Sequence, residues 1–118
     1  MAGLNKVMLI GNLGNDPEMF LSENDLTIAK FNIATNENWK DKNGEIKKRT
    51  EWHRIVAFGK LGKICGDYLS KGKQVYIEGR IQNRKWEDKE GTDRYYYEIV
   101  ASQMIMLGAK EGNTEIGA

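Results

Sequence analysis

All three tryptophans of this 118-residue chain lie beside positively charged residues. An indole ring gains most by burial, so its repeated placement among cations indicates a surface built for a particular ligand. Unpaired nucleic acid offers what such a surface binds, because its bases stack on aromatic rings and its phosphates attract cations. The pairs are Trp39 with Lys40, Trp52 with Arg54, and Trp86 with Lys85.

Positive charge is concentrated in the middle of the chain. The net charge is only +1, but residues 40–94 hold 15 lysines and arginines against 9 aspartates and glutamates. A polyanion responds to such a local patch, although a solvated, salt-bridged surface fits the charges equally well. The cations are Lys42, Lys47, Lys48 and Arg49 at one predicted hairpin, Arg84, Lys85, Lys89 and Arg94 at a second, and Lys60, Lys71 and Lys73 beside a predicted helix.

Four aromatic residues are candidate stacking platforms. Arg54 lies between two of them on one face of a predicted strand, an arrangement suited to a base and its phosphate. The alternative is structural, since Val56 shares the face of Trp52 and Phe58, and the other two rings could pack on hairpin stems. The four are Trp39, Trp52, Phe58 and Trp86.

Enzymatic chemistry has few candidate residues. His53 and Cys65 are the only histidine and the only cysteine, too few for a zinc site. No Walker-type glycine loop, paired catalytic carboxylates or nucleophile elbow is found. We expect no catalytic residue, metal or cofactor. Cys65 is predicted to be a small core residue, and His53 to pack or to lie at a subunit interface.

The composition favours one soluble domain. One cysteine allows no internal disulfide, which suits a reducing compartment, and no apolar run is long enough for a signal peptide or a membrane span. We therefore expect a cytoplasmic protein without a membrane partner. The predicted boundaries are residues 1–108 for the domain and 109–118 for a flexible C-terminal end.

Alternating apolar and polar residues, interrupted by one stripe with helical spacing, predict an all-β fold with one helix. Two long hairpins project, and five strands with a helix between the third and fourth are the layout of a Greek-key OB-fold barrel. The predicted strands are 6–13, 26–35 with an extension to 40, 46–58, 74–86 and 94–107, and the predicted helix is 61–69. Alternation predicts that Phe31 and Ile33 are buried and that Val75, Ile77, Gly79 and Ile81 point inward.

Glycines predict the turns. Asn43-Gly44 is typical of a type I′ hairpin turn, and Gly91 marks a second hairpin tip. Gly11 and Gly14 are interpreted as bends at a strand end, and Gly72 as the stop of the helix.

Motifs spread along the chain resemble those of bacterial-type single-stranded DNA-binding proteins, the SSB family. They span roughly residues 4–107 in order and without large gaps. They are Asn5-Lys6-Val7, Ile10-Gly11-Asn12-Leu13-Gly14, Asp16-Pro17-Glu18, Thr50-Glu51-Trp52-His53-Arg54, Phe58-Gly59-Lys60-Leu61, Tyr68-Leu69, Lys71-Gly72, Gln74-Val75-Tyr76-Ile77-Glu78-Gly79, Arg84-Lys85-Trp86, and Asp93-Arg94-Tyr95.

The resemblance implies a homotetramer of OB folds with single-stranded DNA wrapped around it. It assigns stacking to Trp39, Trp52, Phe58 and Trp86, and phosphate contacts to Lys42, Arg54, Lys60, Lys71, Arg84, Lys85 and Arg94. It assigns His53 to a subunit interface, with Gln74, Tyr76 and Glu78 nearby. The implied role is sequence-independent protection of single strands in DNA replication, recombination and repair, at the nucleoid in the cytoplasm.

Two features depart from the family pattern. Full-length members usually carry an acidic C-terminal tip that recruits replication and repair enzymes, and the printed sequence ends at Ala118 without one. The segment 21–26 is more acidic than the family pattern leads us to expect, which counts against DNA contacts from it. The alternatives to DNA binding are an OB-fold RNA-binding or replication-restart accessory module, and a purely structural oligomer with Tyr76 and His53 at its interface.

Overall fold

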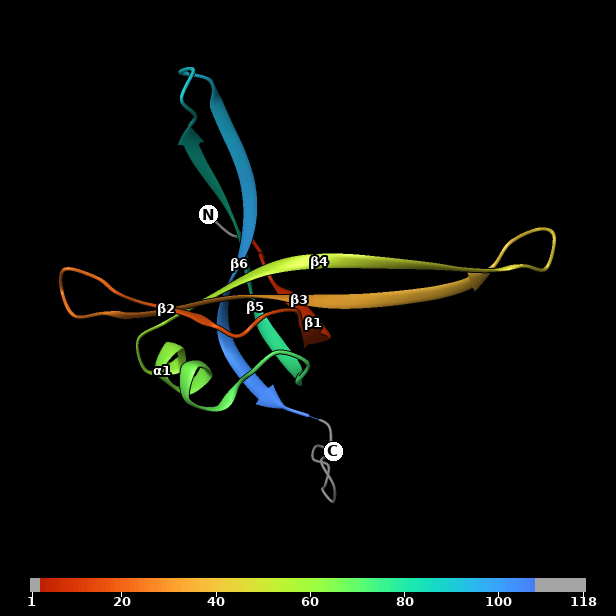
Figure 1. Cartoon of the computed structure of the whole chain (residues 1–118), viewed down its shortest axis with the longest axis horizontal. Helices are drawn as coiled ribbons and strands as arrows, with labels where there is room; N and C mark the ends of the chain where they lie inside the picture. Colours follow the sequence, from red (N-terminus) through yellow and green to blue (C-terminus); the bar gives the residue numbers. More distant parts are fainter. Residues whose placement is uncertain (1–2, 108–118) are drawn as a thin grey trace.

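The computed structural model describes residues 3–107, and the predicted boundary at 108 and the end 109–118 lie outside them. Six strands and one helix form the described part of the chain (Figure 1). The elements are β1 Val7–Leu13, β2 Glu18–Leu21, β3 Thr27–Lys40, β4 Ile46–Phe58, α1 Gly59–Tyr68, β5 Gln74–Glu87 and β6 Asp93–Met106.

Five of the strands close into a barrel. The sheet order is β1-β5-β6-β4-β3-β2, and β1 also pairs with β3, which joins the two ends of the five-stranded part. The closing pairs are Asn12 with Ala34 and Leu13 with Ile33. All pairings are antiparallel except β4 with β6, which are parallel at two positions. This is the predicted OB-fold barrel, with α1 between β4 and β5.

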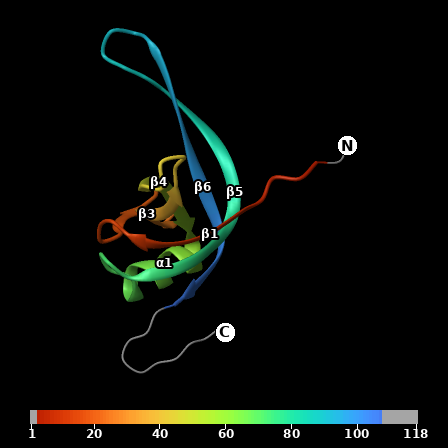
Figure 2. The same ribbon diagram turned by 90° about the vertical axis from the view of Figure 1, so that its right-hand side faces the viewer.

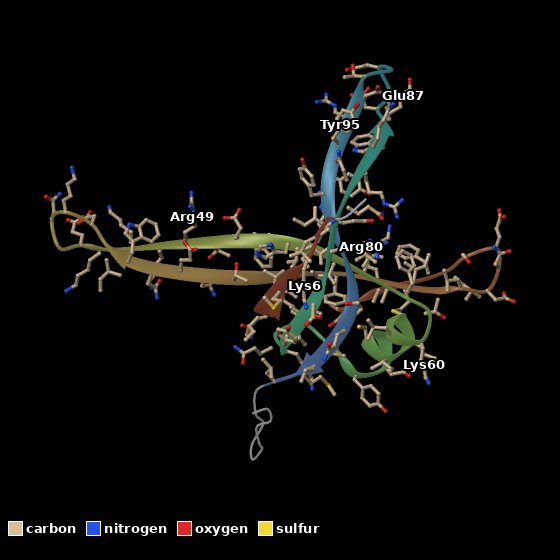
Figure 3. All side chains as sticks on the ribbon, turned by 180° about the vertical axis from the view of Figure 1, so that it is seen from behind. Lys6, Arg49, Lys60, Arg80, Glu87 and Tyr95 are labelled. Atoms are coloured by element: carbon tan, nitrogen blue, oxygen red, sulfur yellow. The ribbon has the colours of Figure 1, made fainter. Side chains whose placement is uncertain are left out.

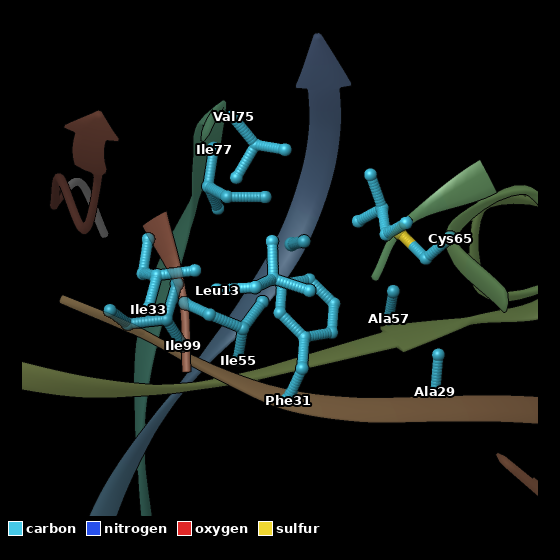
Figure 4. Close-up of a cluster of buried hydrophobic side chains, with 12 residues drawn as sticks. Leu13, Ala29, Phe31, Ile33, Ile55, Ala57, Cys65, Val75, Ile77 and Ile99 are labelled. Carbon is cyan, nitrogen blue, oxygen red and sulfur yellow. The ribbon is translucent and has the colours of Figure 1, made fainter. Parts of the chain in front are cut away.

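The barrel core is built from the inward side chains of every barrel strand together with α1 (Figure 4). Alternation along β3 sends Phe31 and Ile33 inward, as predicted, and Ile55 of β4 is buried beside them. Cys65 is fully buried among them, which confirms its prediction as a core residue, and burial raises the pKa of its thiol to about 11. The remaining members are Leu13, Ala29, Ala57, Leu69, Val75, Ile77, Ile99 and Ala101.

Two hairpins extend far beyond the barrel and project in different directions (Figures 1 and 2). One is formed by the outer halves of β3 and β4, which pair continuously from Ile28 and Phe58 to Lys40 and Ile46. The other is formed by the outer halves of β5 and β6. Ile81 was predicted to point inward, but it is 46% exposed because β5 has already left the core there.

Two local predictions need correction, those for Gly72 and Gly11, and one strand was missed. β2 was not predicted, because its four residues are too few for a clear alternation. The helix ends at Tyr68, one residue before its predicted end, so Gly72 is not the residue that stops it and lies instead in the following turn with a φ of 92°. Gly11 lies inside β1, where a Cβ atom would collide with the Ala34 carbonyl oxygen. Gly14 forms the predicted bend directly after β1, and it also leaves room for the Trp52 ring, which a Cβ atom at that position would strike.

The hairpin turn at Asn43-Gly44 is not type I′. That turn needs positive φ at both central residues, and among the described residues Asp25 is the only non-glycine residue with positive φ. The Gly44 N–H instead donates to the Asp41 carbonyl oxygen at 3.1 Å, and only Gly44 is left-handed, with a φ of 81°. This is a four-residue turn closed by a left-handed glycine.

Candidate nucleic-acid interface

The three indole rings lie outside the barrel, as predicted. Trp39 is 46% exposed, Trp52 59% and Trp86 50%, so each leaves a substantial part of its ring accessible. Phe58 is partly buried and is the least accessible of the four predicted platforms. The face that Trp52 and Phe58 share is not exposed along its whole length, since Val56 between them is buried.

The pairing of β3 with β4 determines which way these rings point. Trp52 lies opposite Ala34, whereas Trp39 lies opposite Lys47. Residues that face each other across a ladder share a face, and 34 and 39 differ by an odd number, so the two tryptophans occupy opposite faces of the β3–β4 ribbon. On the other hairpin Trp86 lies opposite Arg94, on the same face as Arg84 and Tyr96.

Arg54 is the best-placed of the predicted phosphate ligands. Its guanidinium carbon lies 4.5 Å from the centre of the Tyr96 ring, a cation–π contact that holds the side chain without neutralising it. Tyr96 comes from β6, whose backbone pairs with β4 at only two positions, Ile55 with Ile99 and Val56 with Val100. Among the described residues Arg54 forms no ion pair, so its charge is available.

Three other predicted phosphate ligands are already engaged with carboxylates. Lys85 lies 3.5 Å from Asp93, and Arg94 lies 2.9 Å from Asp88. The Arg84 Nε donates to Glu98 at 2.6 Å, and this hydrogen bond raises the pKa of the guanidinium. Glu98 is only 4% exposed, so its charge has to be compensated by a partner of this kind.

The remaining predicted cations are exposed and carry no ion pair within residues 3–107. They come from the first hairpin, from the start of α1 and from the turn that precedes β5. Figure 3 shows where these elements carry their side chains, with Arg49 on the first hairpin, Glu87 and Tyr95 toward the end of the second, and Lys60 at α1. These free cations are Lys42, Lys60 and Lys71.

The predicted interface residues fall into two places. Gln74, Tyr76 and Glu78 alternate along the outer face of β5, and the Tyr76 hydroxyl donates to Glu78 at 2.7 Å. This bond, together with Lys6 at 3.2 Å, lowers the pKa of the Glu78 carboxyl. His53 lies apart from them on β4, with its Nε2 2.9 Å from the Thr35 hydroxyl oxygen.

Next to the β5 residues, β1 exposes two large apolar side chains. Met8 is 63% exposed and lies opposite Glu78, and Ile10 is 55% exposed and lies opposite Tyr76. Exposed apolar side chains next to polar ones have the composition of a protein–protein contact surface. The structure therefore brings Gln74, Tyr76 and Glu78 together with an apolar surface, and leaves His53 elsewhere.

Sequence reasoning missed three residues of the surface around Arg54, namely Tyr96, Phe20 and Lys30. Tyr96 was one of three consecutive tyrosines that could not be separated without the register of β6. Phe20 and Lys30 were missed because β2 was missed, and the Lys30 ammonium lies 5.4 Å from the centre of the Phe20 ring. A signal existed, since Met19, Phe20 and Leu21 form an apolar run directly after a turn.

Other kinds of site are not seen in the described part of the chain. Residues 3–107 contain no group of three histidine, cysteine, aspartate or glutamate side chains placed to bind a metal. The only helix described there, α1, has ten residues and is neither long nor apolar enough to cross a membrane.

Comparison with known proteins decides the family. The model of the single-strand binding protein family matches residues 4–107. A curated relative, single-stranded DNA-binding protein 1 of Chlorobaculum tepidum, is 57% identical over 110 residues, covering 92% of this chain and 68% of that protein. The chain belongs to the single-strand binding protein family.

Solved structures agree with this membership. The SSB of Plasmodium falciparum in complex with single-stranded DNA superposes with a TM-score of 0.86 at 36% identity, covering 92% of this chain and 98% of that one. A deletion mutant of the Thermus aquaticus single-stranded DNA-binding protein gives 0.80 at 30% identity, with 92% of this chain and 52% of that one covered. The fold and family that the sequence motifs indicated are confirmed.

Proposed function

We propose that this member of the single-strand binding protein family binds single-stranded DNA without sequence preference. Bases stack on exposed aromatic rings, and neighbouring lysines and arginines neutralise the phosphates. The observation that carries the proposal is the exposure of all three indole rings, with Trp52 on the same face as the unpaired Arg54. The Plasmodium relative, described as a complex with single-stranded DNA, supports it.

The proposed contacts divide between two kinds of cation. Lys42, Arg54, Lys60 and Lys71 are free to contact phosphates, and Trp39, Trp52, Phe58 and Trp86 are the stacking rings. Arg84, Lys85 and Arg94 are tied to carboxylates, so we expect them mainly to shape the second hairpin and to contribute less to phosphate neutralisation.

The proposed biological form is a homotetramer. The apolar surface around Met8 and Ile10, with Gln74, Tyr76 and Glu78, supplies one subunit contact, and His53 belongs to another. Bound DNA would pass from subunit to subunit, and the protein would protect single strands during replication, recombination and repair at the nucleoid in the cytoplasm. The chemistry is binding, and we expect no catalytic turnover.

The test is a titration with dT oligomers, followed by quenching of tryptophan fluorescence. Trp52→Ala should cost about 1–3 kcal/mol of binding free energy, with dT and dC oligomers alike, because stacking does not depend on base identity. Tyr68→Ala is the matched control, since Tyr68 is equally exposed at 59% but lies on α1 and outside the proposed set. Equal affinities of wild type and Trp52→Ala would remove the stacking role, and preference for matched RNA would reassign the ligand.

A further inference from the structure

The face that carries Trp52 and Arg54 also carries a hollow of about 430 Å³, of whose lining residues the predicted contacts include only Arg54. It is bordered by side chains from β2, β3, β4 and β6, and so lies where these four strands lie side by side. The residues that matter here are Glu18, Lys30, Asn32, Arg54, Tyr96 and Glu98.

Two cations border the hollow, and each lies over an aromatic ring. Arg54 stacks on Tyr96 at 4.5 Å, and Lys30 lies 5.4 Å from the centre of Phe20. Ring contacts of this kind attract a cation electrostatically and limit its motion without supplying a counter-charge. In the described structure neither cation forms an ion pair with a carboxylate, so both charges remain available to a ligand.

The two cations are close enough to act on one ligand. Asn32 pairs with Arg54 and Lys30 pairs with Val56, which makes Lys30 the diagonal neighbour of Arg54 across the β3–β4 ladder. Such diagonal neighbours lie about 7–8 Å apart, within reach of two long side chains that converge on one group.

The charges around the hollow favour an anion. Glu98 borders it, but its carboxylate is bound by Arg84 at 2.6 Å, and the Gln82 amide lies 3.3 Å away. Glu18 lies opposite Lys30 in the β2–β3 ladder, without forming an ion pair with it. With Glu98 compensated, Lys30 and Arg54 outnumber the one remaining carboxylate.

We propose that this hollow is a nucleotide subsite, in which Lys30 and Arg54 together hold the phosphate backbone of a bound DNA strand. Phe20 and Tyr96 are positioning residues that keep the two cations over the hollow. The inference rests on the proposed binding of single-stranded DNA, and it extends the DNA path from β4 across β3 to β2, an element that the predicted contacts did not include.

The experiment measures affinity for one dT oligomer over a range of salt concentrations. Each neutralised phosphate of a single strand contributes about 0.7 to the slope of log K against log salt, so Lys30→Gln should lower the slope by about 0.7. The same contact corresponds to about a five-fold loss of affinity at 0.1 M salt. Lys63→Gln is the control, because Lys63 lies on α1 and pairs with Asp67, and its slope should equal that of wild type.

The positioning role needs a second pair of variants. Tyr96→Leu should lower both the affinity and the salt slope, whereas Tyr96→Phe, which keeps the ring under Arg54, should match wild type. Phe20→Leu and Phe20→Tyr should behave in the same way toward Lys30. Thermal unfolding of each variant identifies any loss that comes from the fold, and rescue by the ring-preserving variants shows that the ring itself acts.

Failure of the subsite differs from failure of the proposed function. If dT oligomers do not quench the tryptophan fluorescence of the wild-type protein, the proposal of DNA binding itself is wrong. If wild type binds but Lys30→Gln keeps the full slope, the subsite is overturned. Equal behaviour of Tyr96→Leu and Tyr96→Phe would overturn the positioning role of Tyr96.

Discussion

The two hairpins have the same tip but different arms. At one tip Asp41 accepts hydrogen bonds from the N–H groups of Asn43 and Glu45, and at the other Asp88 accepts them from Glu90 and Thr92. A left-handed glycine closes each turn, and in each the backbone of the aspartate bonds the residue four positions later. The pentapeptides Asp-Lys-Asn-Gly-Glu and Asp-Lys-Glu-Gly-Thr are therefore two copies of one turn.

The arms differ in charge and in aromatic content. Residues 36–50 contain five cations, three carboxylates and one aromatic ring, whereas residues 83–97 contain four of each. In the first arm the ion pairs of the described residues involve only Lys47, with Asp41 and Glu45 at the tip. In the second, Lys85 and Arg94 pair across the hairpin. The first arm is suited to phosphates and the second to bases.

The largest expected effect is in the second arm, residues 83–97, which we call the aromatic arm. Trp86→Ala should cost about 1–3 kcal/mol of DNA binding free energy and leave the salt slope unchanged, because stacking releases no counterions. Titration with one dT oligomer at low and at high salt measures both quantities. A fall in slope of the size seen when a cation is removed would contradict the division between the arms.

In the first arm, residues 36–50, which we call the cationic arm, removing a charge should change the salt dependence of DNA binding instead. Lys42→Gln should lower the salt slope by about 0.7, the contribution of one phosphate, because Lys42 is exposed and has no ion-pair partner within residues 3–107. The comparison in the other arm is the double variant Lys85→Gln with Asp93→Asn, which removes an existing pair. Its slope should not change. A drop of about 0.7 there would show that Lys85 leaves Asp93 to bind a phosphate.

Substitutions at the two hairpin tips should have equal effects, and these should be smaller than the effects of substitutions in the arms. Gly44→Ala and Gly91→Ala should each lower the free energy of unfolding by about 1 kcal/mol, since a Cβ atom is disfavoured at a φ of 81°. The space around Gly44 is open, so the cost there is one of backbone conformation alone. Denaturant unfolding measures it, with Gly44→Asn as the milder control. A large difference between the two alanine variants would mean that the turns are not equivalent.

The β2–β3 tip shows how far this turn could be read from the sequence. Ser22 accepts hydrogen bonds from the N–H groups of Asn24 and Leu26, and Asp25 occupies the left-handed position with a φ of 63°. The turn is the same as in the two long hairpins, with serine for aspartate and aspartate for glycine. Asn-Gly predicted a hairpin at 43–44 but the wrong turn, because the side chain of Asp41 selects the geometry.

The barrel itself was largely predictable, because alternation and the helical stripe are local signals. Phe31, Ile33 and Cys65 were placed correctly in this way. Contacts between distant strands were not predictable. The Arg54–Tyr96 stack depends on a parallel pairing of only two positions, Ile55 with Ile99 and Val56 with Val100, and no local pattern specifies that register.

The smallest expected effect is that of low pH on the stability of the second hairpin tip, which depends on Asp88. The hydrogen bond from the Thr92 N–H, and then the Arg94 side chain, hold the pKa of the Asp88 carboxyl below its ordinary value. A lowered pKa in the folded state means that this stabilisation is present above about pH 3.9, the value of an unfolded aspartate, and is lost as the pH falls through the folded value.

Carboxyl carbon NMR across an acid titration measures this pKa directly. Arg94→Gln should raise the pKa of Asp88 only part of the way to about 3.9, because the backbone hydrogen bond, which is the larger cause, remains. A full return to that value in Arg94→Gln would show that the ion pair at 2.9 Å, rather than the turn, dominates. The tip would then depend on its arm, and the two hairpins would differ in their turns as well as in their charges.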